Sequence, residues 1–475
     1  MNMRKTKIVC TLGPASSSEQ IITEMMLAGM NVARLNFSHG THETQKLQIE
    51  KIKKLREQLG LPIAILLDTK GPEIRLCDFK NGKTELIEGE SFTLTIKELP
   101  GNSKIASVTY MNLPNQIKPG GEVLIDDGKV MLKVENTDAE NVYCRVVVGG
   151  VISNHKGINI PGTHMDAQYL SENDKKDILF GIENDIDFIA ASFIRSKDDV
   201  IALRKFIDYN GGHSIKIISK IENLEGVNNF NEILNYSDGI MIARGDMGVE
   251  VAYERLPGLQ KKFIKKCYKS GKMVITATQM LESMVSNPTP TRAEITDVAN
   301  AVFDGTSAVM LSGESAAGKY PVQSIKVMAK IVAQAEKDAF EMDCYKDIKY
   351  DVDTLDITNA ICDAACITAK DVNVKAIIAV TRHGHTARRM SKFRPQEPIV
   401  ASTPIEKTFY QLALSWGVFP VLARWQTEFD ELIRHAIDCA KQVDLVAEGD
   451  MVVITAGIPL DSTGNTNLLK VQVVQ

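Results

Sequence analysis

Short apolar segments recur along most of the chain, and each one passes into polar residues at its end. Eight of them have the character of strands and occupy residues 7–13, 31–39, 63–71, 187–195, 216–223, 239–248, 273–281 and 308–315. Their first halves are continuously apolar, which is typical of parallel strands buried on both faces. Helical segments lie between them, for example 17–28, which begins at a serine-rich cap. Eight strand–helix units predict a TIM (β/α)8 barrel, and a doubly wound sheet is the competing fold.

The regular alternation of strands and helices stops between Pro72 and Asp166. Short segments with a period of two replace it, and one hairpin pattern joins 123–125 to 130–134 through Asp126-Asp127-Gly128. We therefore expect a small β-barrel domain inserted after the third strand of the main barrel. It would lie over the carboxyl-terminal mouth of that barrel, either as a functional lid or as an insertion without a role.

A second α/β region begins near Tyr345. A helical segment at 355–370 precedes five strand-like segments at 376–381, 398–403, 418–423, 451–456 and 468–474. The predicted domains are a barrel from 1–70 and 168–345, a β lid at 71–167 and a C-terminal α/β domain at 346–475. The chain has 475 residues, which is more than one hydrophobic core usually supports, so several domains are expected.

Composition argues against two classes of partner. The chain has 55 basic and 60 acidic residues, and this balance is unlike that of a protein built to bind nucleic acid or an anionic membrane surface. No apolar segment approaches the roughly 18 to 20 residues that a membrane span needs. The apolar segment 8–12 is too short for a signal peptide, so we expect a cytoplasmic protein.

Polar residues gather at the ends of the predicted strands, where the active sites of barrels lie. Glu222 and Asp246 end neighbouring strands, so their carboxylates could share one Mg²⁺. Lys220 and Glu222 are two residues apart and face the same side of a strand. A lysine beside a metal, with Arg34 nearby, would suit a substrate that carries a phosphate and a carboxylate. A structural ion pair between Lys220 and Glu222 is an equally open alternative.

One further motif has the spacing of a phosphate-binding loop. Residues 313–319 read GESAAGK, but Tyr320 occupies the position where a serine or threonine would bind Mg²⁺. A phenol is too bulky for that role. We interpret this segment as the loop that follows the eighth strand.

Several long motifs resemble those of the pyruvate kinases over essentially the whole chain. They are KIVCTLGPAS from Lys7, MNVARLNFSHG from Met30, DTKGPEIR from Asp68, NHKG from Asn154, ISKIEN from Ile218, IARGDMGVE from Ile242, ITATQMLESM from Ile275, PTRAE from Pro290 and MLSGES from Met310. The resemblance implies a phosphotransferase of glycolysis that transfers the phosphoryl group of phosphoenolpyruvate to ADP, giving pyruvate and ATP. It also implies the predicted domain arrangement, a homotetramer and allosteric control.

The same resemblance implies roles for the residues at the barrel mouth. Arg34 and Lys220 would hold the phosphoryl group, and Glu222 and Asp246 would bind Mg²⁺ (or Mn²⁺). This is catalysis by positioning and charge neutralisation.

The substrate carboxylate would be bound by the backbone of Gly245 and Asp246 and by the Thr278 hydroxyl. Thr278, or a water that it orients, is also the candidate for protonating the enolate, although a free hydroxyl is a weak acid.

A second set of residues is implied to bind K⁺ and the nucleotide. The K⁺ ligands would be Asn36, Ser38, Asp68 and Thr69. The nucleotide contacts would be Asn36, Phe37, Ser38, His39, Arg75 and Lys156, the last when the lid closes. Members of the family that work without K⁺ have lysine at the position of Glu73, so the acid here implies a K⁺ requirement. The alternative is that Glu73 only pairs with Arg75.

The C-terminal domain contains a candidate anion site. A threonine-containing segment follows a predicted strand and opens a helix that carries Arg388 and Arg389, so amides, hydroxyls and basic groups could bind a phosphate. Its residues are Thr381, Arg382, His383, Gly384, His385 and Thr386. In the family this region binds sugar-phosphate activators, and a nucleotide effector is the other possibility. His383 departs from the usual serine, and Asp461 in a later loop could repel a second phosphate.

Two alternatives to a pyruvate kinase are considered. One is another barrel enzyme that stabilises an enolate with Mg²⁺, such as an aldolase acting on pyruvate, which would not need the lid, Arg75 or a K⁺ site. The other is a metabolite-sensing scaffold without catalysis. An intact set of catalytic and metal-binding candidates argues against the scaffold, namely Arg34, Lys220, Glu222, Asp246 and Thr278.

Overall fold

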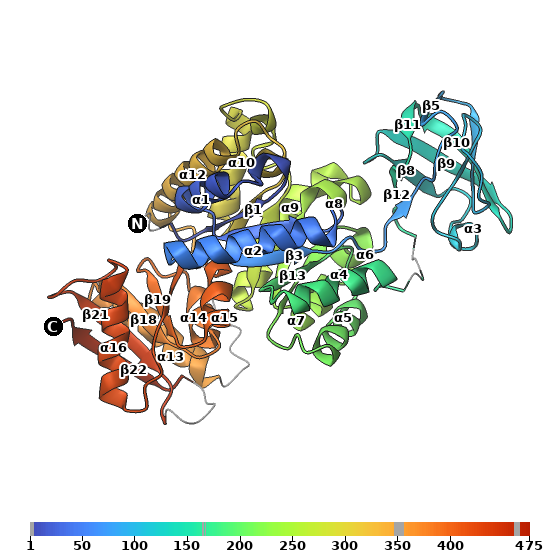
Figure 1. Cartoon of the computed structure of the whole chain (residues 1–475). Coiled ribbons are helices and arrows are strands. Elements are labelled where there is room, and N and C mark those ends of the chain that lie inside the picture. The colour runs from blue at the N-terminus through green and yellow to red at the C-terminus, as the bar shows by residue number, and fades with distance from the viewer. Residues whose placement is uncertain (1–3, 164–165, 167, 346–355, 460–465) are drawn as a thin grey trace.

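The computed structural model describes residues 4–163, 166, 168–345, 356–459 and 466–475. Eight parallel strands close into a barrel in the order β1-β17-β16-β15-β14-β13-β3-β2, as predicted from the eight apolar segments. The strands are β1 Lys7–Thr11, β2 Val32–Asn36, β3 Ala64–Asp68, β13 Phe188–Ala191, β14 Lys216–Ile221, β15 Gly239–Ala243, β16 Met273–Ala277 and β17 Ala308–Leu311. The barrel is central in the molecule (Figure 1).

The barrel strands are apolar throughout because both of their faces are covered. Val9, Leu66 and Met241 belong to one buried cluster, whereas the adjacent Ile8 and Ile65 belong to another that also includes helix residues. Side chains alternate across a strand, so the first cluster fills the barrel interior and the second packs against the surrounding helices.

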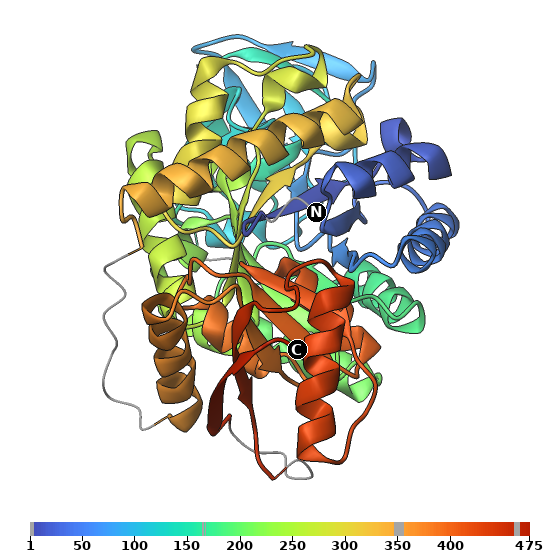
Figure 2. The same ribbon diagram turned by 90° about the vertical axis from the view of Figure 1, so that its left-hand side faces the viewer.

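Helices surround the barrel on the outside (Figures 1 and 2). They are α1 Glu19–Ala28, α2 His42–Leu59, α4 Glu172–Glu183, α5 Lys197–Tyr209, α6 Leu224–Asn228, α7 Phe230–Tyr236, α8 Arg244–Glu250, α9 Leu256–Lys269, α10 Arg292–Phe303, α11 Gly313–Ala316 and α12 Pro321–Glu341. The expected serine cap is present, since Ser18 Oγ accepts a hydrogen bond from the Ile21 amide. One expectation was wrong: the strand predicted at 239–248 ends at Ala243, and α8 begins at Arg244.

The inserted region is a β domain with its own hydrophobic core, which includes Phe92 and Leu132. Its elements are β4 Ile74–Arg75, β5 Lys83–Leu86, β6 Ser91–Thr95, β7 Ile105–Ser107, α3 Leu113–Gln116, β8 Glu122–Ile125, β9 Val130–Thr137, β10 Asn141–Val148, β11 Gly150–Ser153 and β12 Gly157–Asn159. The predicted hairpin is the antiparallel pair β8–β9. Because the domain follows β3, it lies at the carboxyl-terminal end of the barrel, and Figure 1 shows it at one end of the molecule.

The C-terminal region packs against the opposite end of the barrel (Figure 2). Its elements are α13 Ile357–Asp371, β18 Ala376–Val380, α14 His385–Ser391, β19 Ile399–Thr403, α15 Glu406–Gln411, β20 Val418–Leu422, α16 Phe429–Gln442, β21 Met451–Ala456 and β22 Leu468–Val473. The sheet order is β20-β19-β18-β21-β22. Lys7 Nζ donates to the Val418 carbonyl at 2.7 Å, which ties the first residue of β1 to this domain. No helix in the described ranges is both long and apolar enough to span a bilayer.

Candidate active site

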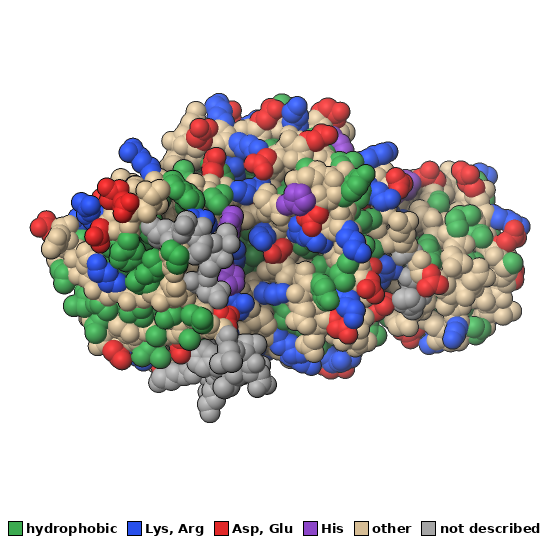
Figure 3. Space-filling model, turned by 90° about the horizontal axis from the view of Figure 1, so that it is seen from below, with side chains coloured by type: hydrophobic (Ala, Val, Ile, Leu, Met, Phe, Trp, Pro, Cys, Tyr) green, Lys and Arg blue, Asp and Glu red, His purple; other side chains and the backbone are tan. Residues whose placement is uncertain are grey.

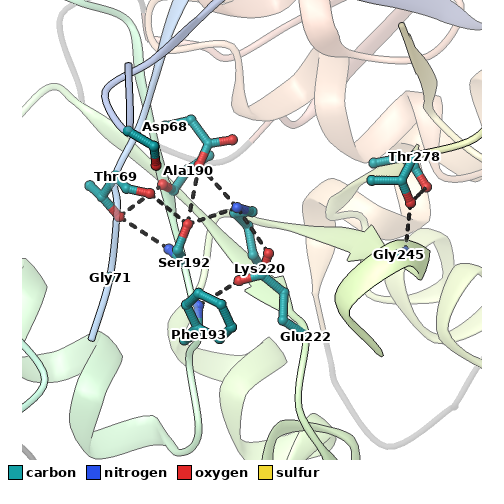
Figure 4. A network of polar contacts seen from close by, with 12 residues as sticks. Asp68, Thr69, Gly71, Ala190, Ser192, Phe193, Lys220, Glu222, Gly245 and Thr278 are labelled. Atoms are coloured by element: carbon teal, nitrogen blue, oxygen red, sulfur yellow. Dashed lines mark hydrogen bonds and ion pairs between the residues drawn. The ribbon is translucent and has the colours of Figure 1, made fainter. Parts of the chain in front are cut away.

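Lys220 lies at the centre of a buried polar network at the carboxyl end of β14 (Figure 4). Its Nζ donates to Ser192 Oγ at 2.7 Å and lies 3.0 Å from Asp68 Oδ1 and 2.9 Å from Glu222 Oε1. Burial lowers the pKa of Lys220, but Asp68 and Glu222 outweigh burial and hold this pKa above its usual value. The side chain is therefore a cation, and its ion pair with Glu222 is one of several contacts.

Asp68 joins Lys220 to Arg34. Arg34 Nε donates to Asp68 Oδ2 at 2.6 Å, and Arg34 Nη1 donates to Thr11 Oγ1 at 2.8 Å. Burial opposes ionisation of Asp68, but Arg34 and then Lys220 lower its pKa below the usual range. One ionised carboxylate thus holds two cationic side chains side by side, which gives the barrel mouth a focus of positive charge.

Glu222 is buried in the same region, and Asp246 beside it is half-buried. Burial raises the pKa of Glu222 to about 7, with Lys220 opposing this effect and Asp246 adding to it. Burial also raises the pKa of Asp246. Glu222 Oε2 accepts a 2.6 Å hydrogen bond from the amide of Phe193, whose φ of +54° is unusual for a non-glycine residue.

These two carboxylates fit a hard divalent cation. A cation bound between them would offset the loss of solvation that now favours their protonated forms. The described part of the chain contains no group of three or more His, Cys, Asp or Glu side chains arranged to hold a metal. Two carboxylates without a full protein cage are typical of Mg²⁺ that shares its coordination with a substrate and with water.

Thr278 and Gly245 are brought together at the ends of β16 and β15. The Gly245 amide donates to Thr278 Oγ1 at 2.8 Å, and Thr278 Oγ1 donates to the Ala277 carbonyl at 2.6 Å (Figure 4). The two groups that were expected to hold a carboxylate are therefore bonded to each other. Binding of a carboxylate would require the Gly245 amide to exchange this partner.

The four residues implied in K⁺ binding follow two neighbouring strands. Asn36 and Asp68 are opposite each other in the parallel pairing of β2 with β3. Asn36 Oδ1 accepts from the Ser38 amide at 3.1 Å, and Thr69 Oγ1 accepts from the Ser192 amide at 3.1 Å. In the same loop after β2, Phe37 is half-buried and His39 is exposed. The loop lies at the mouth of the barrel, as expected from its place after β2.

A cleft of about 810 Å³ separates the β domain from the barrel. Arg75 and Lys156 line it from the β domain, and Asp246 lines it from the barrel. Lys156 Nζ lies 2.8 Å from Asp126 Oδ1, and Arg75 Nη2 lies 2.5 Å from Glu73 Oε2. The alternative pairing of Glu73 with Arg75 is therefore present. Both basic residues therefore line the cleft with a carboxylate partner beside each of them.

The candidate anion site of the C-terminal domain borders a second pocket of about 220 Å³. Five of its predicted residues line this pocket, namely Thr381, Arg382, His383, His385 and Thr386. The sixth, Gly384, precedes α14 and has a φ of +76°. Thr386 is buried and its Oγ1 lies 2.6 Å from Thr466 Oγ1, so this hydroxyl already has a partner.

The same pocket has one aromatic wall. Trp425 lines it, and the Arg382 guanidinium lies 4.4 Å from the centre of the Trp425 ring. Burial, together with Arg389 and Arg388, lowers the pKa of His385. Asp461, which was expected to influence this site, lies outside the described residues.

Sequence reasoning missed two residues of the network and the contacts of a third. Ser192 binds Lys220 and the Phe193 amide binds Glu222. Both residues follow β13, one of three barrel strands to whose ends no site residue was assigned. Counting residues from the end of the apolar run at 187–191 would have found them. Arg244 belongs to the motif that begins at Ile242, but its many contacts could not be foreseen from the sequence.

Comparisons with known proteins agree over nearly the whole chain. The family model described as pyruvate kinase, barrel domain, matches residues 3–325, and the model described as pyruvate kinase, alpha/beta domain, matches residues 359–472.

Curated relatives and a solved structure are similar over the same extent. A pyruvate kinase of Clostridium acetobutylicum is 48% identical and covers 100% of both chains. One from Staphylococcus haemolyticus is 48% identical, over 99% of this chain and 81% of that protein. The crystal structure of a pyruvate kinase from Cryptosporidium parvum superposes with a TM-score of 0.93 at 38% identity, over 100% of this chain and 97% of that chain.

Proposed function

Since the chain belongs to the pyruvate kinase family and transfers the phosphoryl group of phosphoenolpyruvate to ADP, giving pyruvate and ATP, we propose that the network around Lys220 is its catalytic centre. The observation that carries this proposal is the cluster of Lys220, Arg34 and Asp68 beside two acids, Glu222 and Asp246, whose pKa values are raised. The alternative of an aldolase acting on pyruvate is excluded by the family assignment.

Phosphoryl transfer would take place between two cationic side chains. Arg34 and Lys220 would hold the phosphoryl oxygens, and Asp68 would keep both side chains in position. The bond from phosphorus to the enol oxygen breaks, and a bond from phosphorus to an oxygen of the ADP β-phosphate forms. The electron pair of the broken bond stays on the substrate as an enolate. Positioning and neutralisation of the spreading negative charge supply the catalysis.

Glu222 and Asp246 would bind Mg²⁺, or Mn²⁺ in its place. The cation would neutralise charge on the phosphoryl and enolate oxygens when it is bound. Support comes from the raised pKa of both acids, which reflects the burial of negative charge without full compensation. Glu222 must release its proton before it can act as a ligand.

A monovalent cation would bind beside this centre. The oxygens of Asn36, Ser38, Asp68 and Thr69 would serve as ligands for K⁺. These residues share the ends of β2 and β3, and Asp68 contributes a carboxylate that is already ionised. Glu73 supplies no ammonium group there, which supports a requirement for an external cation.

The enolate would be protonated from the side of Thr278. The amides of Gly245 and Asp246, at the start of α8, and the Thr278 hydroxyl would bind the carboxylate. In the protonation step a C–H bond forms at the methylene carbon as the O–H bond of Thr278, or of a water bound to it, breaks. Solvent then returns a proton to that oxygen. The close contact of Gly245 with Thr278 supports their joint action.

The nucleotide would bind between the barrel and the β domain. Phe37 and His39 would contact it from the barrel, and Arg75 and Lys156 from the β domain, which would act as a lid. Support comes from the cleft between the two domains and from the two basic residues that line it. On closure Lys156 would exchange Asp126 for a phosphate.

We further propose the domain boundaries 1–70 with 168–345 for the barrel, 71–167 for the lid and 346–475 for the regulatory domain. The pocket at 381–386 would bind a phosphorylated effector, because basic side chains and an aromatic wall meet there.

A cytoplasmic homotetramer is proposed as well. Hydrophobic side chains gather on the C-terminal domain in Figure 3, and Val471 and Val473 are 40% and 50% exposed on the edge strand β22.

Binding of Mn²⁺, measured by electron paramagnetic resonance, tests the metal site. Glu222→Gln and Asp246→Asn should each weaken binding at least about tenfold, since even a residue that only supports a ligand is worth that much. Glu232→Gln is the matched control, because Glu232 pairs with Lys197 on the surface. Unchanged binding in both site variants would refute the assignment of these ligands.

A further inference from the structure

Thr278 has a backbone conformation that its side chain disfavours. Its φ is +66°, and the next residue, Gln279, has a φ of +54°. Two consecutive non-glycine residues with positive φ are uncommon, and a β-branched threonine is especially hindered there. Such a conformation persists only where the surrounding structure holds it, and it is often found at functional sites.

Arg244 is the residue that holds this segment. Its guanidinium group has five N–H donors in a fixed plane, and its side chain is only 14% exposed. The acceptors are the Ala277 carbonyl at 3.1 Å, the Thr278 carbonyl at 2.6 Å, Met280 Sδ at 2.9 Å, Gln260 Oε1 at 3.3 Å and Asp297 Oδ1 at 2.8 Å. All five donors are therefore used, and three of the acceptors belong to the segment around Thr278.

Asp297 anchors the guanidinium from the outside. It belongs to α10, and its Oδ2 lies 2.7 Å from Arg244 Nη1. This ion pair fixes the end of the arginine side chain, so that the two carbonyl contacts are made by a group that cannot swing away. A lysine could not replace it, because one ammonium group cannot reach two carbonyls and a carboxylate in a planar arrangement.

The neighbour of Arg244 holds the other side of the same threonine. The Gly245 amide donates to Thr278 Oγ1, while the Arg244 side chain binds the Thr278 carbonyl (Figure 4 shows the Gly245 contact). Adjacent residues at the start of α8 thus fix both the backbone and the hydroxyl of Thr278. The orientation of this hydroxyl is set by residues 244 and 245 together.

We propose that Arg244, anchored by Asp297, is a positioning residue that sets the rate of enolate protonation by holding Thr278 in its left-handed conformation. The inference rests on the proposed role of Thr278 in that step. All five donors of the Arg244 guanidinium group bind protein acceptors, so none is left for a substrate. Its loss should therefore slow proton transfer and leave binding of the nucleotide unchanged.

Exchange of the pyruvate methyl protons with D2O, in the presence of Mg²⁺ and K⁺, isolates proton transfer from phosphoryl transfer. Arg244→Lys should lower the exchange rate roughly 10- to 100-fold, which is the effect of misplacing a reacting group by about 1 Å. The KM for ADP should stay within about twofold of the parent, as expected for a variant that leaves uniform binding intact. Arg204→Lys is the matched control, because Arg204 also pairs with a carboxylate and donates to a carbonyl, away from Thr278.

A double variant separates positioning from a general structural effect. If Arg244 acts through Thr278, Arg244→Lys should cause no further loss of exchange in a Thr278→Ala background. Losses that multiply would overturn the inference. Exchange that is lost in Thr278→Ala but kept in Arg244→Lys would refute the inference alone. Exchange that survives in Thr278→Ala would refute the role of Thr278 and the inference with it.

Asp297→Asn gives a second variant in case Arg244→Lys does not fold. The Asp297 side chain is 35% exposed, so an amide is tolerated there, and it keeps one oxygen acceptor while removing the charge. The exchange rate should fall in the same direction as in Arg244→Lys, but by a smaller factor. Parent-like exchange in Asp297→Asn would overturn the anchoring role.

Discussion

Replacing Lys220 with methionine removes one positive charge from a buried cluster and keeps most of the side-chain volume. Nζ lies 3.0 Å from Asp68 Oδ1 and 2.9 Å from Glu222 Oε1. Loss of one preorganised charged contact to the transition state costs about 3–4 kcal/mol, or roughly 10²–10³ in turnover. Binding of phosphoenolpyruvate should change far less, because Arg34 remains in place 2.6 Å from Asp68.

The same substitution alters the two acids that Lys220 contacts. Removal of one partner of a buried ion pair usually costs about 3–5 kcal/mol of folding free energy. We expect less here, because Asp68 keeps Arg34 and Glu222 can take up a proton. Burial raises the pKa of Glu222 to about 7 even with Lys220 opposing it. Without Lys220 this pKa rises further, so Mg²⁺ binding should require a higher pH in the variant.

Steady-state turnover between pH 7 and pH 9 and thermal unfolding should be measured together. Lys216→Met is the matched control, since Lys216 lies at the other end of β14 and pairs with Asp238 at 3.2 Å. Turnover of Lys220→Met near that of the parent would show that Lys220 is only a structural partner of Glu222. Full recovery of turnover at high pH would show that the loss came from protonation of Glu222 and not from a missing phosphoryl contact.

The remaining predictions concern the cations and the effector. Turnover should be very low in a K⁺-free tetramethylammonium buffer and should rise on adding K⁺. Glu73→Lys should reduce this dependence. Equal rates of the parent protein with and without K⁺ would refute the K⁺ requirement. Because Glu222 must lose a proton to bind Mg²⁺, the apparent affinity should fall about tenfold per pH unit below about pH 7. Calorimetry should show this slope vanish in Glu222→Gln, and a slope that persists would contradict it. The double substitution Thr381→Glu and Thr386→Glu should abolish activation by phosphorylated metabolites and leave unactivated turnover intact. If no such metabolite activates the parent protein, the effector site is ruled out.

The barrel could be predicted because strands covered on both faces must be apolar throughout. The runs at 64–68 and 239–243 show this clearly, and they are buried along their whole length. The polar residues after each run then had to meet at one end of the barrel. This is why Lys220 and Asp68, far apart in the chain, could both be placed near the site.

Other features depend on contacts that no local pattern contains. The position of Arg244 at the start of α8 and the positive φ of Thr278 depend on tertiary contacts. Arg244 binds Asp297 of α10 and the carbonyl of Thr278, which follows β16. The ion pair of Lys156 with Asp126 joins two loops of the β domain. The Phe193 amide donates to Glu222, and Phe193 has a left-handed backbone conformation after β13. The sequence does not predict this conformation, because the residue is a phenylalanine and not a glycine.

The most direct test is to measure pyruvate and ATP together after phosphoenolpyruvate is added to the purified protein. With ADP, Mg²⁺ and K⁺ present, we predict that pyruvate and ATP appear in equal amounts, since each phosphoryl group leaves one substrate and joins the other. Omission of ADP or Mg²⁺ should stop both products. Release of pyruvate without ADP, or pyruvate without an equal amount of ATP, would contradict phosphoryl transfer at this centre.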